Sequence, residues 1–183
     1  MGTAADSDRG RAAGARLPAL GARGEGWIGL QMLVEIGALV VAALTGPVLT
    51  GPGRAIVGVL GTALMVAGVL LFAWGAAELG RSFSVWVDPR PGARLVTSGP
   101  YRSIRHPVCT AQVLIVAGWA LACASLVGLL LVPVVAWYLD RYKLAREEQT
   151  LLAAYPGYRD YMARVTHRML PWPASRGAGV TGA

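Results

Sequence analysis

The sequence predicts an all-α, polytopic membrane protein. About four transmembrane helices are expected, two of them in a short helical hairpin, followed by cytoplasmic C-terminal helices. Three observations lead to this fold class. Of the 183 residues, 55% are hydrophobic and only 15% are charged, whereas soluble domains carry nearer a quarter of charged residues. The apolar residues form long uncharged runs, and the basic residues flank these runs almost entirely on one side.

The first two apolar runs define two predicted spans. Trp27–Thr45 is interrupted only by Glu35, and Ala55–Ala77 has 23 residues without a charge. About 20 residues are enough for a helix to cross the hydrocarbon core. Inside a bilayer every backbone amide must be paired within the chain, so both runs are predicted to be helices. The stretch 45–53, rich in Pro and Gly, predicts a short turn between them.

The third apolar run, Pro107–Leu139, has 33 uncharged residues. Two full-length spanning helices and a turn would need more than about 40 residues. We therefore interpret this run as a tight hairpin of two shortened or tilted helices that turns near Cys123–Ser125.

The polar residues after the hairpin predict further helical structure. A helix is expected to about Ala154, then a turn at Tyr155–Gly157 and a second short helix. The domain organisation that follows is a single membrane-embedded domain, 26–173, between disordered tails at 1–25 and 174–183.

The distribution of charge predicts the orientation in the membrane. Of 17 Lys and Arg residues, four precede the first span, five lie between the second span and the hairpin, and seven follow the hairpin. Only Arg54 lies on the other side. The positive-inside rule assigns the basic face, with both termini and the polar loops, to the cytoplasm. The net charge of +7 then reflects orientation and contact with anionic headgroups, and no nucleic-acid partner is expected.

Two polar clusters on that face are candidates for chemistry, and the first is the loop Leu95–Pro107. It holds two Arg, one His and one Tyr in 13 residues. Pro107 suits the first position of a helix, which places His106 at a helix N-terminus, where unpaired amides favour an anionic group such as a carboxylate. The alternative is that Arg102 and Arg105 anchor to headgroups and that His106 only precedes the helix.

The second cluster contains Lys143, Glu147 and Glu148. Lys143 and Glu147 are four residues apart on one helical face, so one interpretation is a surface ion pair. Carboxylates that face a site would instead suit a positively charged ligand. Glu35, about 12 Å into the first span, is either functional, as intramembrane carboxylates often are, or it makes a hydrogen bond between packed helices or snorkels to the membrane surface.

The order of these motifs resembles the isoprenylcysteine carboxyl methyltransferase family and, more loosely, the phospholipid methyltransferases. The likeness extends from Gly80 to Pro173 and rests on Leu95–Tyr101, Arg105–Pro107, Glu147–Glu148, Tyr155–Tyr158 and Arg168–Pro171. It implies a multi-helix membrane fold, without a Rossmann sheet, that encloses S-adenosylmethionine between the hairpin and the C-terminal segment.

The resemblance also implies roles for individual residues, with no metal site among them. The residues implied to contact the cofactor are Asp88, Ala93, Arg94, Leu95, Val96, Tyr101, His106, Pro107, Val108, Cys109 and Glu147. Arg105 and Glu148 take the catalytic positions, and Lys143 takes the place of a substrate-contacting arginine. The family usually has Tyr at the position of Cys109 and Arg at the position of Lys143, so the identity of the methyl acceptor stays open.

The function we expect is that of an S-adenosylmethionine-dependent methyltransferase acting on a lipophilic, lipid-like substrate at the bilayer. A carboxylate acceptor would need no general base. A phospholipid or other lipid amine is the alternative, with Glu148, Glu147 or His106 as the base. The alternatives of another class are a non-catalytic membrane interaction or lipid-binding protein and, more remotely, a nicotinamide-dependent membrane reductase.

Overall fold

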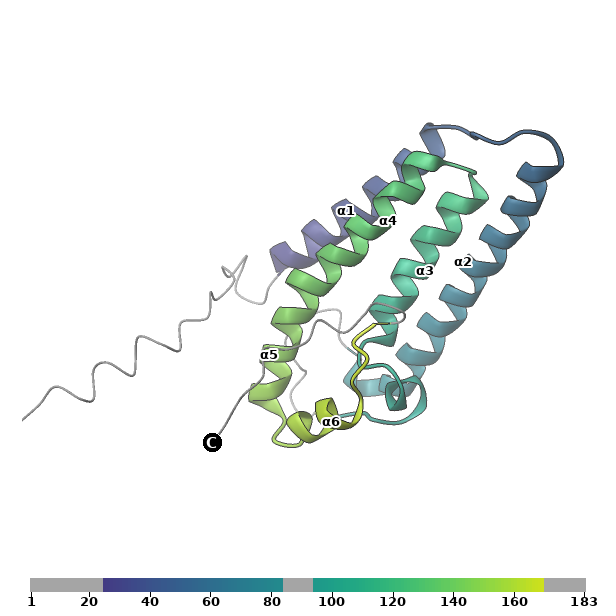
Figure 1. The fold of residues 1–183 in the computed structure, drawn as a ribbon. Coiled ribbons are helices and arrows are strands. Elements are labelled where there is room, and N and C mark those ends of the chain that lie inside the picture. Colours follow the sequence, from purple (N-terminus) through teal and green to yellow (C-terminus); the bar gives the residue numbers. More distant parts are fainter. Residues whose placement is uncertain (1–24, 84–93, 170–183) are drawn as a thin grey trace, which may run out of the picture.

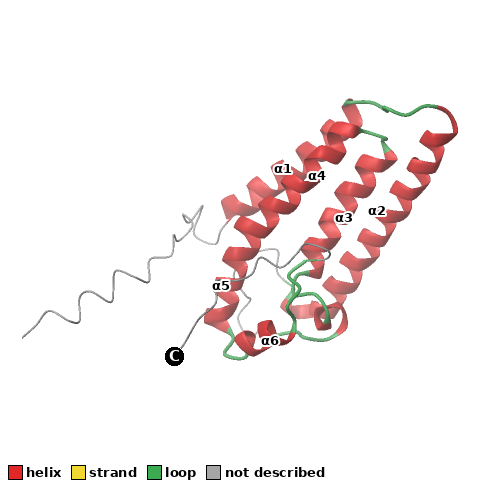
Figure 2. Ribbon diagram, in the orientation of Figure 1, coloured by secondary structure: helices red, strands yellow, loops and turns green. Residues whose placement is uncertain are grey.

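The described part of the chain is helical. The computed structural model describes residues 25–83 and 94–169, and these contain helices, turns and loops but no strand (Figures 1 and 2). The predicted all-α fold class is therefore confirmed for these residues. The predicted tails at 1–25 and 174–183 fall outside the described residues, except for Glu25, and so does the domain boundary at residue 173.

Four helices lie side by side in a bundle: α1 (Glu25–Leu44), α2 (Gly51–Leu79), α3 (Pro107–Ala122) and α4 (Leu126–Tyr138). In the bundle α3 lies between α2 and α4, and α1 packs against α4 and α3 (Figure 1). The predicted hairpin is present, since α3 and α4 are joined through Cys123–Ser125. Ser125 caps α4 by accepting a hydrogen bond from the amide of Gly128 at 2.9 Å.

Beyond α4 the helix continues without a break through a π-helical segment, η3 (Leu139–Leu144), into α5 (Ala145–Ala154). A turn then leads to α6 (Tyr158–Arg164), which confirms the helix, turn and short helix predicted for this region. The buried residues Val135, Leu139, Leu144 and Glu148 follow one another at intervals of four, five and four. The interval of five falls in the π-helical segment, where backbone bonds span five residues.

Two described helical stretches, Gly26–Leu44 and Gly51–Ser82, are long and apolar enough to cross a membrane. The second includes the short 3₁₀ turn η1 (Gly80–Ser82), and α3 is a shorter apolar helix. Large apolar side chains point away from the bundle, for example Leu33 and Val59, which are each 69% exposed. Such a surface is unfavourable in water but is suited to contact with lipid tails.

Helices α2 and α3 approach each other closely because glycines line their contact. A Cβ atom built on Gly61 would lie 2.6 Å from the carbonyl oxygen of Gly118, and one on Gly118 would lie 2.7 Å from the carbonyl oxygen of Gly61. A Cβ on Gly68 would lie 3.0 Å from the carbonyl oxygen of Ala111. Small residues permit this backbone approach between helices in a membrane.

Hydrogen bonds to backbone carbonyls hold α1 against the hairpin. The indole Nε1 of Trp119 donates to the carbonyl of Leu39 at 3.0 Å, and the hydroxyl of Tyr138 donates to the carbonyl of Trp27 at 3.1 Å. Within α1, Gln31 donates to the carboxylate of Glu35 at 2.9 Å. This bond lies within one helix and is not the bond between helices that one alternative for Glu35 expected, so a functional role for Glu35 stays a prediction.

Candidate active site

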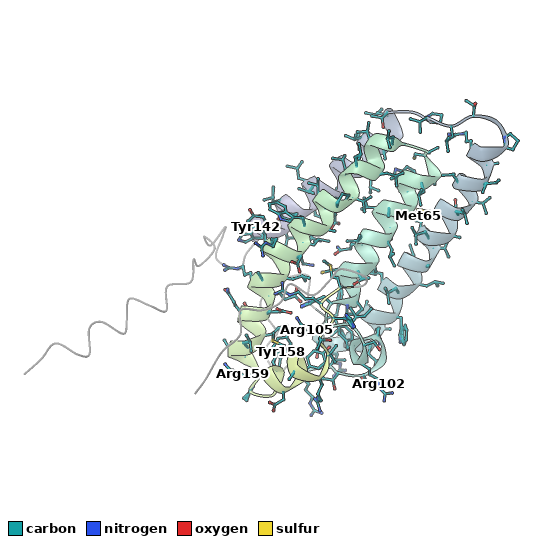
Figure 3. All side chains as sticks on the ribbon, viewed as in Figure 1. Met65, Arg102, Arg105, Tyr142, Tyr158 and Arg159 are labelled. Atoms are coloured by element: carbon teal, nitrogen blue, oxygen red, sulfur yellow. The ribbon has the colours of Figure 1, made fainter. Side chains whose placement is uncertain are left out.

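The predicted polar residues gather at one end of the bundle, where the start of α3, the helix α5 and the residues after α6 meet. Figure 3 shows Arg105 and Tyr158 at this end, far from Met65 on α2. Pro107 occupies the first position of α3 and His106 its N-cap position, as predicted. The residues after α6, which we call the C-terminal segment (Val165–Met169), lie along this helix start.

Two backbone hydrogen bonds hold the C-terminal segment in place. The amide of Arg105 donates to the carbonyl of His167 at 2.9 Å, and the amide of His106 donates to the carbonyl of Arg168 at 3.1 Å. The guanidinium of Arg105 also donates to the carbonyl of Val165 at 2.8 Å. The segment thus satisfies amides just before α3 that would otherwise lack partners.

Glu148 lies at the centre of a buried ionic network. Its Oε1 atom accepts a hydrogen bond from Nε of Arg105 at 3.0 Å and lies 3.2 Å from Nε2 of His106. Its Oε2 atom accepts from the guanidinium of Arg168. Burial alone would raise the pKa of Glu148, but hydrogen bonds from His106 and Arg168 outweigh burial and hold that pKa well below its usual range.

Arg168 connects this network to the long helix. Its NH1 atom donates to Oδ1 of Asp140 at 3.1 Å, while its NH2 atom bonds Glu148. Asp140 is buried in the π-helical segment, and the side chain of Arg168 is 22% exposed. A guanidinium shared by two carboxylates has the planar, forked geometry that favours such contacts.

Glu147 differs from its neighbour Glu148. Its side chain is 30% exposed, compared with 6% for Glu148. The nearest ionic group to its carboxylate among the described residues is Nδ1 of His106, at 3.8 Å, which is longer than a hydrogen bond. Glu147 therefore presents a carboxylate beside His106 that is available to a ligand, whereas both oxygens of Glu148 are engaged.

Lys143 lies further into the bundle and bonds Cys109. The distance from its Nζ atom to Sγ of Cys109 is 3.4 Å. In the described part of the chain no carboxylate oxygen lies within 4 Å of this ammonium group, so the surface ion pair with Glu147 that the four-residue spacing suggested is not formed. Glu35 and Glu147 are nevertheless close enough for their charges to act on Lys143.

Tyr101 and Val108 lie at the start of α3 against α2. The hydroxyl of Tyr101 donates to the carbonyl of Gly75 at 3.4 Å, and Val108 also contacts Gly75. Tyr101 belongs to the 3₁₀ turn η2 (Gly99–Arg102), and its burial raises the pKa of its hydroxyl above the usual range. The structure thus brings His106 and Glu147 together, and it packs Tyr101 and Val108 against α2, with Tyr101 near enough to Glu147 for the charge of that carboxylate to act on its hydroxyl.

The remaining predicted cofactor residues come from the loop before η2. Leu95 packs against a cluster of Tyr158, Tyr161 and Val165, and the amide of Arg94 lies 3.3 Å from the hydroxyl of Ser82. Val96 is half-buried. The other two predicted residues in this loop, Asp88 and Ala93, lie outside the described residues.

Comparison with known families identifies the group to which this arrangement belongs. The model of the isoprenylcysteine carboxyl methyltransferase family matches residues 59–153, more than half of the 183 residues. The chain belongs to this family. It is accordingly a methyltransferase of the isoprenylcysteine carboxyl type and, with its two long apolar helices, a membrane protein. No curated protein matches the chain.

In this isoprenylcysteine carboxyl methyltransferase family member, the family match begins at Val59 in α2. It continues through α3 and α4 and ends near the end of α5. It includes Arg105, His106, Lys143 and both glutamates. The match does not include α1, α6 or the C-terminal segment.

Two members of the ionic network had no role in the sequence-based interpretation. Arg168 belongs to the motif Arg168–Pro171 with no role of its own, and Asp140 belongs to none of the predicted clusters. Asp140 is the first charge after 33 uncharged residues, and that position was a usable signal. Nothing in the local sequence, however, indicated that Arg168 would meet Asp140, because the contact joins residues 28 apart across two turns.

Proposed function

We propose that this chain uses S-adenosylmethionine to methylate a carboxylate on a lipophilic acceptor at the membrane. In this proposal α1, α2, α3 and α4 all span the bilayer. Both termini, α5, α6 and the active site face the cytoplasm, in keeping with the one-sided distribution of basic residues. The observation that carries the proposal is the pairing of Glu147 with His106 at the start of α3, inside the segment that matches the family.

The chemistry of these side chains fits the proposed cofactor. The carboxylate of Glu147 and the Nδ1 atom of His106 lie 3.8 Å apart. Both can accept hydrogen bonds, so together they suit a protonated amine such as the ammonium group of the cofactor's methionine part. The half-exposed position of Glu147 lets a soluble cofactor approach from the cytoplasm.

When bound, S-adenosylmethionine supplies a methyl group on a positively charged sulfur, so a carboxylate oxygen can form its bond to carbon as the sulfur–carbon bond breaks, with no proton to remove. The protein then has to hold donor and acceptor in line and exclude water. In our proposal Arg105 and Glu148, the two residues expected at the catalytic positions, fix the start of α3 against α5 and so set where His106 and Glu147 point.

Lys143 is the residue that favours a carboxylate acceptor. Its ammonium group is directed into the bundle towards Cys109, and its described partner is a thiol rather than a carboxylate. A half-buried cation that has no ion-pair partner within 4 Å among the described residues suits an acceptor that brings its own negative charge. The apolar walls of the bundle suit the lipophilic part of that acceptor.

Substitution of Glu147 tests the cofactor half of the proposal. The Glu147→Gln variant, purified in detergent, should bind S-adenosylhomocysteine and S-adenosylmethionine about 10- to 100-fold more weakly, because a charge-assisted hydrogen bond to an ammonium group is lost. Isothermal titration calorimetry measures both affinities. The matched control is Asp160→Asn, which removes an exposed carboxylate on α6 and should leave them unchanged.

Two results would contradict this half of the proposal. The first is wild-type protein that is folded but binds neither ligand, and this would also support the non-catalytic alternative. The second is a Glu147→Gln variant that binds both ligands as tightly as wild type does.

Substitution of Lys143 tests the acceptor half. With radiolabelled methyl donor, the wild type should methylate lipophilic carboxylic acids in preference to lipid amines and phospholipids. The Lys143→Met variant, similar in shape but uncharged, should lose at least about tenfold in kcat/KM for the acid, because the acceptor carboxylate loses its counter-charge in a buried site. Alkaline treatment identifies the product, since methyl esters release volatile methanol and N-methyl groups do not.

Binding of S-adenosylhomocysteine provides the control for this variant and should stay close to the wild-type value, since Lys143 is assigned to the acceptor. A label that survives alkaline treatment would support the lipid-amine alternative and reject a carboxylate acceptor. Equal kcat/KM in the wild type and in Lys143→Met would remove Lys143 from the acceptor site.

A further inference from the structure

Arg168 lies outside the segment that matches the family, yet it joins two elements of the candidate site. Its carbonyl accepts the amide of His106 at 3.1 Å. Its guanidinium bonds Glu148 on α5 and, at 3.1 Å, Asp140 in the π-helical segment. Arg168 therefore holds Glu148, the residue whose carboxylate lies 3.2 Å from the imidazole of His106.

The contacts of Glu148 determine which ring nitrogen of His106 carries hydrogen. With guanidinium groups on both of its oxygens, Glu148 is ionised, and an ionised carboxylate only accepts hydrogen bonds. The ring atom Nε2 of His106, 3.2 Å from Oε1 of Glu148, must then be the donor. The other ring atom, Nδ1, faces Glu147 at 3.8 Å, too far for a hydrogen bond. In the neutral ring Nδ1 is thus left with a free lone pair on the side of Glu147.

We propose that Arg168, itself held by Asp140, is a positioning residue that keeps His106 in the tautomer with hydrogen on Nε2. It does so by binding Oε2 of Glu148, which turns Oε1 towards the imidazole. Without Arg168 the carboxylate of Glu148 is free to rotate and loses one of its two guanidinium partners, so the imidazole no longer has a single preferred tautomer. The consequence for cofactor binding rests on the proposed function, because it is the Nδ1 lone pair that would receive the ammonium group.

The chain has only two histidines, which makes the tautomer directly measurable. In protein labelled with ¹⁵N-histidine and carrying His167→Gln, only His106 contributes ring signals, and His167 is exposed. The ring nitrogen shifts distinguish the two tautomers and the imidazolium. We expect hydrogen on Nε2 alone in this background and a mixture of protonation states after Arg168→Gln. Affinity for S-adenosylhomocysteine should fall at least about tenfold in the same variant.

Three further variants separate positioning from general stability. Asp140→Asn should weaken the bond that holds Arg168, and so it should cause a smaller loss of the Nε2 tautomer than Arg168→Gln does. It serves as the test if Arg168→Gln does not fold. Arg168→Lys should restore part of the Nε2 tautomer, because it keeps the charge but not the fork. Arg164→Gln, on the exposed end of α6, is the matched control and should change nothing.

An unchanged His106 tautomer in folded Arg168→Gln, or in folded Asp140→Asn where the first variant does not fold, would overturn the positioning role. An equal loss of the Nε2 tautomer of His106 in the control Arg164→Gln would also overturn the positioning role. Failure of the wild type to bind S-adenosylhomocysteine would reject the proposed function instead, and it is distinguishable because the ring nitrogen shifts are recorded without ligand.

Discussion

Replacing Glu148 with glutamine should lower the free energy of unfolding by about 3–5 kcal/mol, the usual cost of breaking a buried ionic network by removing one partner. Arg105 would lose its carboxylate and Arg168 one of its two, and neither guanidinium could reach water easily, since the two side chains are only 10% and 22% exposed. Unfolding by sodium dodecyl sulfate in mixed micelles, followed by tryptophan fluorescence, measures this difference.

The neighbouring substitution Glu147→Gln is the matched control for stability. Glu147 is half-exposed and makes no hydrogen bond to Arg105 or Arg168, so its loss should change the free energy of unfolding by less than about 0.5 kcal/mol. The two adjacent substitutions should therefore have different effects. Glu148→Gln should lower stability, and Glu147→Gln should weaken ligand binding. Equal stability of the two variants would show that the network around Glu148 does not hold the fold together.

Acid should reproduce the effect of Glu148→Gln in the wild type. Because the pKa of Glu148 in the folded protein lies below its ordinary value of 4.5, its stabilising contribution is fully present above pH 4.5. The contribution is lost as the pH falls from 4.5 towards the lowered pKa. The Glu148→Gln variant should lack this part of the acid dependence, which the same unfolding experiment records.

The second large effect is expected where α2 and α3 touch. Gly118→Ala would place a methyl group 2.7 Å from the carbonyl oxygen of Gly61 and 2.8 Å from Cα of Met65. These are backbone atoms, so the helices themselves must move apart, and overpacking of this kind costs up to about 3 kcal/mol. The expected result is a less stable bundle in the detergent unfolding experiment.

Gly37→Ala in α1 is the matched control for this substitution. It makes the same change in an apolar helix, but a Cβ atom at Gly37 would meet nothing within 4 Å. It should be neutral or slightly stabilising, because alanine favours helix over glycine by up to about 1 kcal/mol. A Gly118→Ala variant as stable as Gly37→Ala would mean that the close approach of α2 and α3 does not contribute to the fold.

The helices were predictable from the sequence because each is specified by nearby residues. The lengths of the uncharged runs located α1 and α2, and the length of the run Pro107–Leu139 correctly indicated a hairpin with its turn at Cys123–Ser125. Its first helix, α3, is short as predicted, whereas its second continues without a break from α4 to Ala154. Pro107 located the start of α3 because proline suits the first helical position. The π-helical segment was not predicted, since five-residue spacing over a single turn leaves almost no trace in an apolar pattern.

The site was predictable only in part, because its contacts depend on tertiary packing. Spacing could show that Lys143 and Glu147 lie four residues apart, but the π-helical segment changes the geometry between them, and the ammonium group bonds Cys109 instead. The sequence alone does not show which of the adjacent residues Glu147 and Glu148 is bound by other side chains. Hydrogen bonds from Arg105 and from Arg168 of the C-terminal segment distinguish Glu148, which is engaged, from Glu147, which is not.

The π-helical segment has a consequence for changes in chain length. The π-helical turn holds five residues where an ordinary turn holds about four, which is why Leu139 and Leu144 both stay on the buried face of the long helix. Deleting one residue here, for example the exposed Arg141, would restore ordinary winding and keep α5 in register with α4. The same deletion within α4, where the winding is already ordinary, would instead rotate every later residue by about 100° and turn Glu147 and Glu148 away from His106. The π-helical segment is thus the place in the long helix where the loss of one residue should be tolerated best.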